Sequence, residues 1–165
     1  MSLYSFRLAR LSDKDAMLQF MNTHWGSRHP LMNLPDYFTY YYQNGDPSCT
    51  ALNFALCLNE TGDIAALCGF IPSCADGSDI WVSIWCANKK EKGSGLELMD
   101  KLPKLTGAKL LSCNNIRSNT IPFYEFLGYT GARMRHWYRL ALREQFAVAV
   151  PKSRERQPIA GDGYF

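Results

Sequence analysis

The chain has 165 residues, of which 47% are hydrophobic and 20% are charged. This length and composition are typical of one compact soluble domain with a hydrophobic core. No apolar run approaches the roughly 18 residues that a membrane span requires. The N-terminus lacks the pattern of a signal peptide, and a net charge of +3 is too small to indicate nucleic-acid binding by itself.

The first predicted elements are a strand and a helix. Residues 4–11 alternate between apolar and polar side chains, as a strand does, and residues 12–15 have the Ser-x-x-acid pattern of a capping box. Apolar residues at helical spacing continue from Ala16 to Trp25, and we expect Gly26 to end this helix.

A polar and aromatic connection over residues 24–30 leads to a second short helix at residues 34–43. Residues 37–42 of that helix carry five aromatic rings. So many rings cannot all face one core, and some are expected to line a groove. The alternative is a solvated loop and a helix whose rings only pack.

Two strands at residues 52–58 and 64–71, joined by a polar turn, give a strong hairpin signal. Six cysteines occur at irregular spacings without a Cys-x-x-Cys pair, several of them in such apolar runs. This pattern supports neither a zinc nor a redox site and favours buried, reduced thiols. Reduced thiols are typical of reducing compartments, and we therefore expect a cytoplasmic protein. Because the cysteine spacing matches no zinc motif, we expect no bound metal.

The strand expected at residues 79–86 has apolar side chains on both faces, which indicates a central strand between two helix layers. Regular alternation would place Trp81, Ser83 and Trp85 on one face. It would place four apolar side chains on the other: Ile80, Val82, Ile84 and Cys86.

Strands and helices alternate after this point. A helix that Pro103 kinks or ends is followed by a strand at 108–113, a further helix, and a last strand at 133–142. This order implies parallel pairing, whereas the first half of the chain implies antiparallel pairing. The predicted fold class is therefore α/β, of the mixed α+β kind, in a domain spanning residues 1–142, with a basic, flexible tail at 143–165.

Residues 88–99 connect the central strand to the next helix and contain Gly93 and Gly95. Glycines let the backbone approach a ligand, and the first amides of the helix point outward at the positive end of its dipole. This arrangement suits a phosphate or pyrophosphate. A Walker loop and the dinucleotide fingerprint both fail to match, the latter because Leu98 stands where a third glycine is needed. The alternative is an ordinary tight turn.

A second stretch, residues 118–129, predicts a helix with Asn119 as its N-cap, Pro122 in its first turn and Gly128 at its end. Together the two stretches resemble the GNAT superfamily of acyl-coenzyme A-dependent N-acetyltransferases. The pyrophosphate loop of that family, Arg/Gln-x-x-Gly-x-Gly/Ala, is matched by Lys90, Gly93 and Gly95. Its late helix, Phe/Leu-Tyr-x-x-Leu-Gly-Phe/Tyr, is matched by Phe123, Tyr124, Leu127, Gly128 and Tyr129.

The resemblance covers residues 4–140, with Lys90 in place of the usual Arg or Gln. It implies a central mixed sheet of about six or seven strands, flanked by about four helices. It also implies transfer of an acetyl group from acetyl-CoA to a primary amine by direct attack. The residues expected to bind the coenzyme are Ile84, Trp85, Cys86, Lys90, Lys92, Gly93, Ser94, Gly95, Leu96 and Asn119.

The reaction requires a proton acceptor for the amine, a donor for the oxyanion and a donor for the leaving thiolate. Tyr124 is the expected donor to the thiolate, and a backbone amide near residues 84–86 the expected oxyanion donor. The proton acceptor stays open between Asp79, His24, His29 and a chain of waters.

The acceptor is expected to contact residues around the first connection and the central strand, namely Trp25, Arg28, Tyr41 and Trp81. A faint further likeness to acetyltransferases of bacterial surface-polysaccharide synthesis makes a nucleotide-linked amino sugar the leading acceptor. We expect neither membrane nor nucleic acid as a partner, and a homodimer stays open. Two alternatives remain: a non-catalytic acyl-CoA-binding module, and a nucleic-acid-associated domain that uses the basic residues of the last part of the chain.

Overall fold

The computed structural model describes residues 3–25, 29–114 and 116–132. The described residues up to Gly131 belong to one compact unit. The strand expected at 133–142, the tail expected at 143–165 and the boundary expected between them all lie outside the described residues. All six cysteines are described and free, three of them buried and three partly exposed.

Five strands form one sheet in the order β1-β2-β3-β4-β5. The first four pair antiparallel, and β5 pairs parallel with β4. The expected mixed sheet with an antiparallel first half is therefore confirmed, with fewer strands in the described residues than the six or seven expected. The strands are β1 (Ser5–Arg10), β2 (Ala51–Leu58), β3 (Ile64–Pro72), β4 (Asp79–Ala87) and β5 (Leu110–Ser112).

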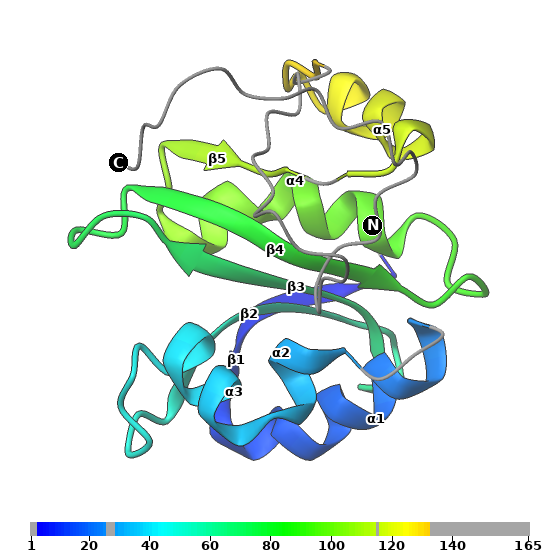
Figure 1. The fold of residues 1–165 in the computed structure, drawn as a ribbon. Coiled ribbons are helices and arrows are strands. Elements are labelled where there is room, and N and C mark those ends of the chain that lie inside the picture. Colours follow the sequence, from blue (N-terminus) through cyan, green and yellow to red (C-terminus); the bar gives the residue numbers. More distant parts are fainter. Residues whose placement is uncertain (1–2, 26–28, 115, 133–165) are drawn as a thin grey trace, which may run out of the picture. The chain divides into compact units, whose positions relative to one another are not determined.

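Helices cover both faces of this sheet (Figure 1). One face carries α1 (Lys14–His24), α2 (Pro30–Asn33) and α3 (Pro35–Tyr42), and the other carries α4 (Ser94–Thr106) and α5 (Ile121–Phe126). Two short 3-10 turns, Leu11–Asp13 and Ser118–Thr120, precede α1 and α5.

Two helix ends differ from their predictions. Pro103 does not end α4, which continues to Thr106 and stops at Gly107, where φ is +74°. Asn119 lies inside the 3-10 turn before α5 and does not cap that helix.

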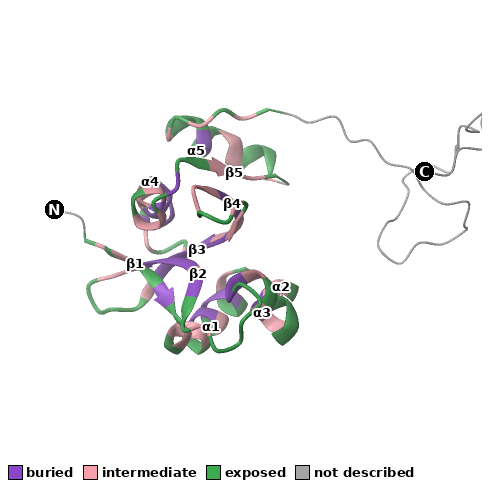
Figure 2. Cartoon of the chain, turned by 90° about the vertical axis from the view of Figure 1, so that its left-hand side faces the viewer, coloured by how far each residue is buried: buried purple, intermediate pink, exposed green. Residues whose placement is uncertain are grey.

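The core consists of two clusters, one on each face of the sheet, and the buried residues lie along the strands and the inner faces of the helices (Figure 2). Met17, Met21 and Phe38 fill the side of α1 and α3. Leu98, Met99 and Leu102 of α4 fill the other side. The central strand is thus covered on both sides, as its apolar sequence predicts.

A bulge in β4 changes which way its side chains point. Gly69 pairs with Ile84 and the next residue of β3, Phe70, pairs with Val82, so Ser83 is an extra residue on β4. The expectation that Ile80, Val82, Ile84 and Cys86 share one face is therefore wrong. Before the bulge these apolar residues pack on the side of α4, and after it Ile84 and Cys86 pack on the side of α1 and α3.

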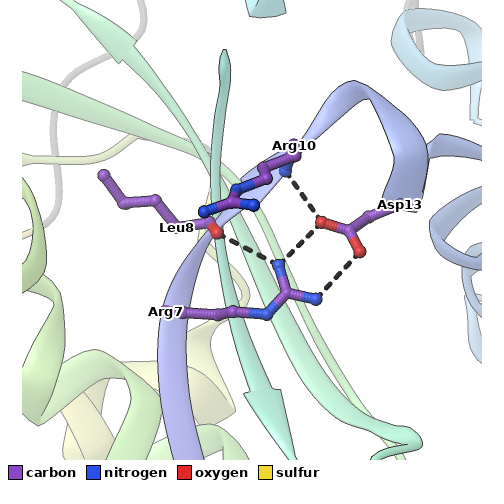
Figure 3. A network of polar contacts seen from close by, with 4 residues as sticks. All are labelled: Arg7, Leu8, Arg10 and Asp13. Carbon is purple, nitrogen blue, oxygen red and sulfur yellow. Dashed lines mark hydrogen bonds and ion pairs between the residues drawn. The ribbon is translucent and has the colours of Figure 1, made fainter. Parts of the chain in front are cut away.

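The 3-10 turn that leads into α1 is held by a carboxylate different from the one predicted for the helix start. The predicted box begins at Ser12, but it is Asp13 that accepts the backbone N–H of Arg10, at 2.8 Å. The two guanidinium nitrogens of Arg7 donate to the two oxygens of Asp13 at 2.7 and 2.8 Å (Figure 3). These bonds hold the pKa of Asp13 below its ordinary value of 3.8.

We predict that Asp13→Asn lowers the free energy of unfolding at pH 7 by about 1 kcal/mol, because it weakens an ion pair and a cap. Since the pKa of the folded carboxylate is lowered, its contribution is present above the unfolded value near 3.8 and is lost as the pH falls through the folded value. Urea unfolding at pH 7 and at acidic pH measures this difference.

The exposed neighbour Asp15 provides the control, and Asp15→Asn should change little. A deficit in Asp13→Asn that stays constant down to strongly acidic pH would show that the charge of Asp13 is not what stabilises this corner.

Candidate active site

A cleft lies where β4 and β5 separate. The two strands pair between Asp79–Trp81 and Leu110–Ser112, and among the described residues β4 has no partner on that side from Val82 to Ala87. Backbone groups of this free part of β4 that face away from β3 have no strand partner in the described part of the chain. A cavity of about 210 Å³ begins at the separation, lined by Val82, Met99, Ser112, Cys113, Tyr124 and Tyr129 among others.

Tyr124 forms part of the wall of this cleft. The residue is 8% exposed, and its ring meets the ring of Trp85 edge-on at 5.3 Å between centroids. Burial raises the pKa of Tyr124, and the neighbouring thiol of Cys113 raises it further. At neutral pH the phenol therefore keeps its proton and is able to donate it to a group bound in the cleft.

The glycine loop folds as a turn that starts α4. Gly93 has φ of +83°, a left-handed conformation that side chains disfavour. Three lysines beside it are exposed: Lys89, Lys90 and Lys92. The amides of Gly95 and Leu96 lie in the first turn of α4, where a helix offers no acceptor of its own. This end of α4 suits an anion.

Ser94 and Gly95 each have a structural task in this loop. The hydroxyl of Ser94 is buried and lies 2.8 Å from the carbonyl oxygen of Glu91, to which it donates. At Gly95, an added Cβ would lie 2.9 Å from the Cβ of Ala87 and 3.3 Å from Nε1 of Trp85. Gly95 therefore lets α4 approach β4 closely, a task that the sequence motif alone does not reveal.

Trp85 connects the loop to Tyr124. Its indole N–H donates to the carbonyl oxygen of Gly95 at 3.1 Å, while its ring contacts Tyr124. Because Ser83 is bulged, Trp85 packs on the side of α4, whereas Ile84 and Cys86 point to the opposite side. The start of α4 and the phenol thus lie on one face of β4, separated by one indole.

The three candidate proton acceptors lie in different surroundings. Asp79 opens β4 and does not line the cleft. His24 ends α1 and packs on the ring of Phe20, with centroids 4.5 Å apart. His29 precedes α2, and its buried Nδ1 has no hydrogen-bond partner among the described residues. Burial lowers the pKa of His29, so that its imidazole is neutral at pH 7 and able to accept a proton.

The expected acceptor-binding residues lie in and around the helices of the other face. Trp25 is 38% exposed, and its ring meets the ring of His29 edge-on at 5.3 Å between centroids. Tyr41 is half-buried and stacks on Tyr37, with centroids 6.5 Å apart. Strand alternation puts Trp81 on the face opposite Val82, and Arg28 lies outside the described residues.

Asn119 is exposed in the turn before α5. Cys113 was not predicted, although it directly follows β5 and contacts Tyr124 within the cleft.

The basic stretch behind the nucleic-acid alternative lies almost entirely outside the described residues. No described group of three or more His, Cys, Asp or Glu side chains is arranged to hold a metal ion.

No protein-family model and no curated protein matches the sequence. Solved structures do match. The aminoglycoside N-acetyltransferase AAC(6')-Iy in complex with CoA is 11% identical over 83% of this chain and 94% of its own, with a TM-score of 0.57. A GNAT-family acetyltransferase of Streptococcus pneumoniae is 12% identical over 82% and 98%, with a TM-score of 0.55. The ribosomal-protein-alanine N-acetyltransferase of Brucella melitensis is 15% identical over 84% and 99%, with a TM-score of 0.54.

The chain has the GNAT fold. At sequence identities of 11 to 15%, the likeness to these structures shows a shared arrangement of strands and helices. The fold expected from the sequence is therefore confirmed. AAC(6')-Iy has also been solved with the bisubstrate analogue CoA-S-monomethyl-acetylneamine. Within the described residues of this GNAT fold, no helix has the length and apolar character needed to cross a membrane.

We predict that Gly95→Ala lowers the free energy of unfolding by about 1 to 3 kcal/mol, because the new methyl group overlaps the Cβ of Ala87. Ala87→Gly removes that Cβ and serves as the matched partner. In the double variant the two costs should not add, and chemical denaturation of all four proteins measures the coupling. Strictly additive losses would contradict a direct contact between the two positions.

Proposed function

We propose that the protein is an N-acetyltransferase that moves an acetyl group from acetyl-CoA to a primary amine of a small molecule, by direct attack in a ternary complex. The observation that carries this proposal is the position of Tyr124 in the cleft between β4 and β5, on the same face of the sheet as the start of α4. One extended ligand would fit this arrangement, with an anionic end at the start of α4 and a reactive end beside Tyr124 in the cleft.

The anionic end would be the diphosphate of the coenzyme. The amides of Gly95 and Leu96 and the positive end of the α4 dipole favour negative charge there, and exposed lysines add attraction. The arm between the diphosphate and the sulfur contains two amide groups. An extended amide chain can pair with a free strand edge, and β4 offers such an edge after Trp81.

The reacting carbonyl would lie near the free part of β4. Attack by an amine forms a tetrahedral oxyanion, and a backbone N–H at residues 84–86 is our proposed donor to it. The C–S bond then breaks, and the electron pair goes to sulfur. The phenol of Tyr124, protonated at neutral pH, donates to the developing thiolate.

The amine must lose a proton before or during attack. Among the three candidates, we favour His29, because its imidazole is neutral at pH 7 and its Nδ1 has no partner among the described residues. None of the three candidate side chains lines the cleft, so this preference rests on the neutral imidazole of His29 and not on its distance from Tyr124. A chain of waters is the remaining route.

For the acceptor, we propose an amino sugar and would test a nucleotide-linked form first. Flat aromatic rings suit the faces of sugars, and Trp25, Tyr41 and Trp81 supply such rings on the side of α1 to α3. The fold neighbour AAC(6')-Iy binds a coenzyme conjugate of an acetylneamine, which supports an amine carried by a sugar.

Binding of acetyl-CoA is tested first. Ligand at about 100 times its dissociation constant should stabilise the protein by about 2.7 kcal/mol, a readily visible thermal shift. Desulfo-CoA should give a comparable shift, because it keeps the diphosphate. Stabilisation by ATP without stabilisation by either coenzyme would refute the proposal.

We further predict that Tyr124→Phe lowers kcat roughly 100-fold while the dissociation constant of acetyl-CoA changes little, because only the donated proton is lost. Release of the coenzyme thiol under saturating amine measures kcat. Tyr37→Phe, on an exposed tyrosine of α3, is the matched control. Unchanged kcat in Tyr124→Phe would remove this phenol from the reaction.

A non-catalytic coenzyme-binding module is the second candidate. It is favoured by one observation: no carboxylate lines the cleft in the part of the chain that the structure describes. Such a module would bind acetyl-CoA but release no thiol with any amine.

A further inference from the structure

Three segments that are distant in sequence meet at one end of the sheet. Pairing of Ser5 with Leu58 brings the start of β1 beside the end of β2, and pairing of Ala66 with Ala87 brings the start of β3 beside the end of β4. The residue before β1, the turn between β2 and β3 and the loop between β4 and α4 are therefore neighbours (Figure 1).

Glu91 stands in the middle of this loop, between lysines. A carboxylate pointing outward here would repel an anion at the start of α4. The structure turns it inward. Its Oε1 accepts from the Nδ2 amide of Asn59 at 3.2 Å, and its Oε2 accepts from the hydroxyl of Tyr4 at 3.2 Å. The Tyr4 hydroxyl also lies 3.2 Å from the carbonyl oxygen of Lys92.

Asn59 is itself held in one orientation. Its Oδ1 accepts from the backbone N–H groups of Thr61 and Asp63, at 3.1 and 2.9 Å, and from the hydroxyl of Thr61 at 2.8 Å. Because Oδ1 is committed to the turn, Nδ2 must face Glu91. The donor that Glu91 meets is thus fixed by the β2–β3 hairpin.

The backbone of Glu91 is held as well. Its carbonyl oxygen accepts from the hydroxyl of Ser94 at 2.8 Å, and its N–H donates to the carbonyl oxygen of Asn88 at 3.0 Å. Side chain and backbone together tie the loop to the hairpin, to the start of β1 and to the first residue of α4. The amides that follow then have a fixed direction.

We propose that Tyr4, Asn59 and Glu91 form a clamp that positions the loop of residues 88–94 for the diphosphate of the coenzyme. This inference rests on the proposed function. The three are positioning residues: they act through the loop, and Glu91 is an anchor despite its charge. Preorganising the loop removes an ordering cost that binding would otherwise incur.

The clamp should matter only for ligands that carry the diphosphate. Asn59→Asp keeps the Oδ1 acceptor of the turn and places a carboxylate oxygen against Glu91 in place of the donor. We expect the dissociation constant of acetyl-CoA to rise about 10-fold. The dissociation constant of S-acetylpantetheine, which lacks the diphosphate, should stay within about 2-fold. Tyr4→Phe should act in the same direction, with Tyr37→Phe as its control.

Glu91→Gln in the Asn59→Asp background exchanges the donor and the acceptor. The new amide can donate to Asp at position 59 while its oxygen accepts from Tyr4, and the net charge equals that of the starting protein. We expect acetyl-CoA affinity to return to within about 3-fold of the starting value. Calorimetric titration of the four proteins of this cycle with both ligands provides the measurement.

Amide hydrogen exchange of the ligand-free proteins separates the clamp from the proposed function. Asn59→Asp should speed exchange at residues 88–96, and the double variant should restore it. If the starting protein binds no acetyl-CoA while exchange follows this pattern, the proposed function fails and the clamp stands. Two results would refute the clamp if acetyl-CoA binds. The first is that Asn59→Asp and Tyr4→Phe change neither the affinity for acetyl-CoA nor the amide exchange. The second is that they weaken the binding of acetyl-CoA and of S-acetylpantetheine by the same factor.

Discussion

The position of the cleft depends on the unequal lengths over which β4 pairs with its two neighbouring strands. Within the part of the chain that the structure describes, β4 is hydrogen-bonded to β3 along nearly its full length on one side and to β5 over three residues on the other. Buried backbone groups require partners, so a strand that loses its neighbour in the middle of a sheet leaves a place where another chain or a ligand fits. The cleft with Tyr124 in its wall begins at that place.

The bulge at Ser83 determines which side chains of β4 lie on the face of the cleft. By shifting alternation one step, it sends Trp85 toward α4 and leaves Ile84 in the opposite cluster. Ser83 itself donates to the carbonyl oxygen of Gly69 and is bonded to the hydroxyl of Tyr42, each at 3.0 Å. The irregularity is therefore built into the sheet by specific polar contacts and is not a defect of packing.

Local patterns in the sequence predict the elements well, because hairpins, helix periodicity and glycine turns are determined by neighbouring residues. The β2–β3 hairpin, α3 and the turn at Gly93 agree with their predictions. The bulge does not follow from the pattern, since every residue of β4 is compatible with regular alternation. The orientation of Glu91 depends on Tyr4, 87 positions away, and on Asn59, 32 positions away, and such contacts leave no local signature.

The position of Tyr4 has a practical side. It precedes the first strand by one residue, yet its hydroxyl reaches a loop on the far side of the hairpin. Truncating the leading residues, or appending an affinity tag that pulls this tyrosine outward, would disturb a distant loop while the sheet itself stayed intact. Under the clamp proposed above, two folded forms of the protein that differ only in their N-terminal extension would differ in coenzyme affinity.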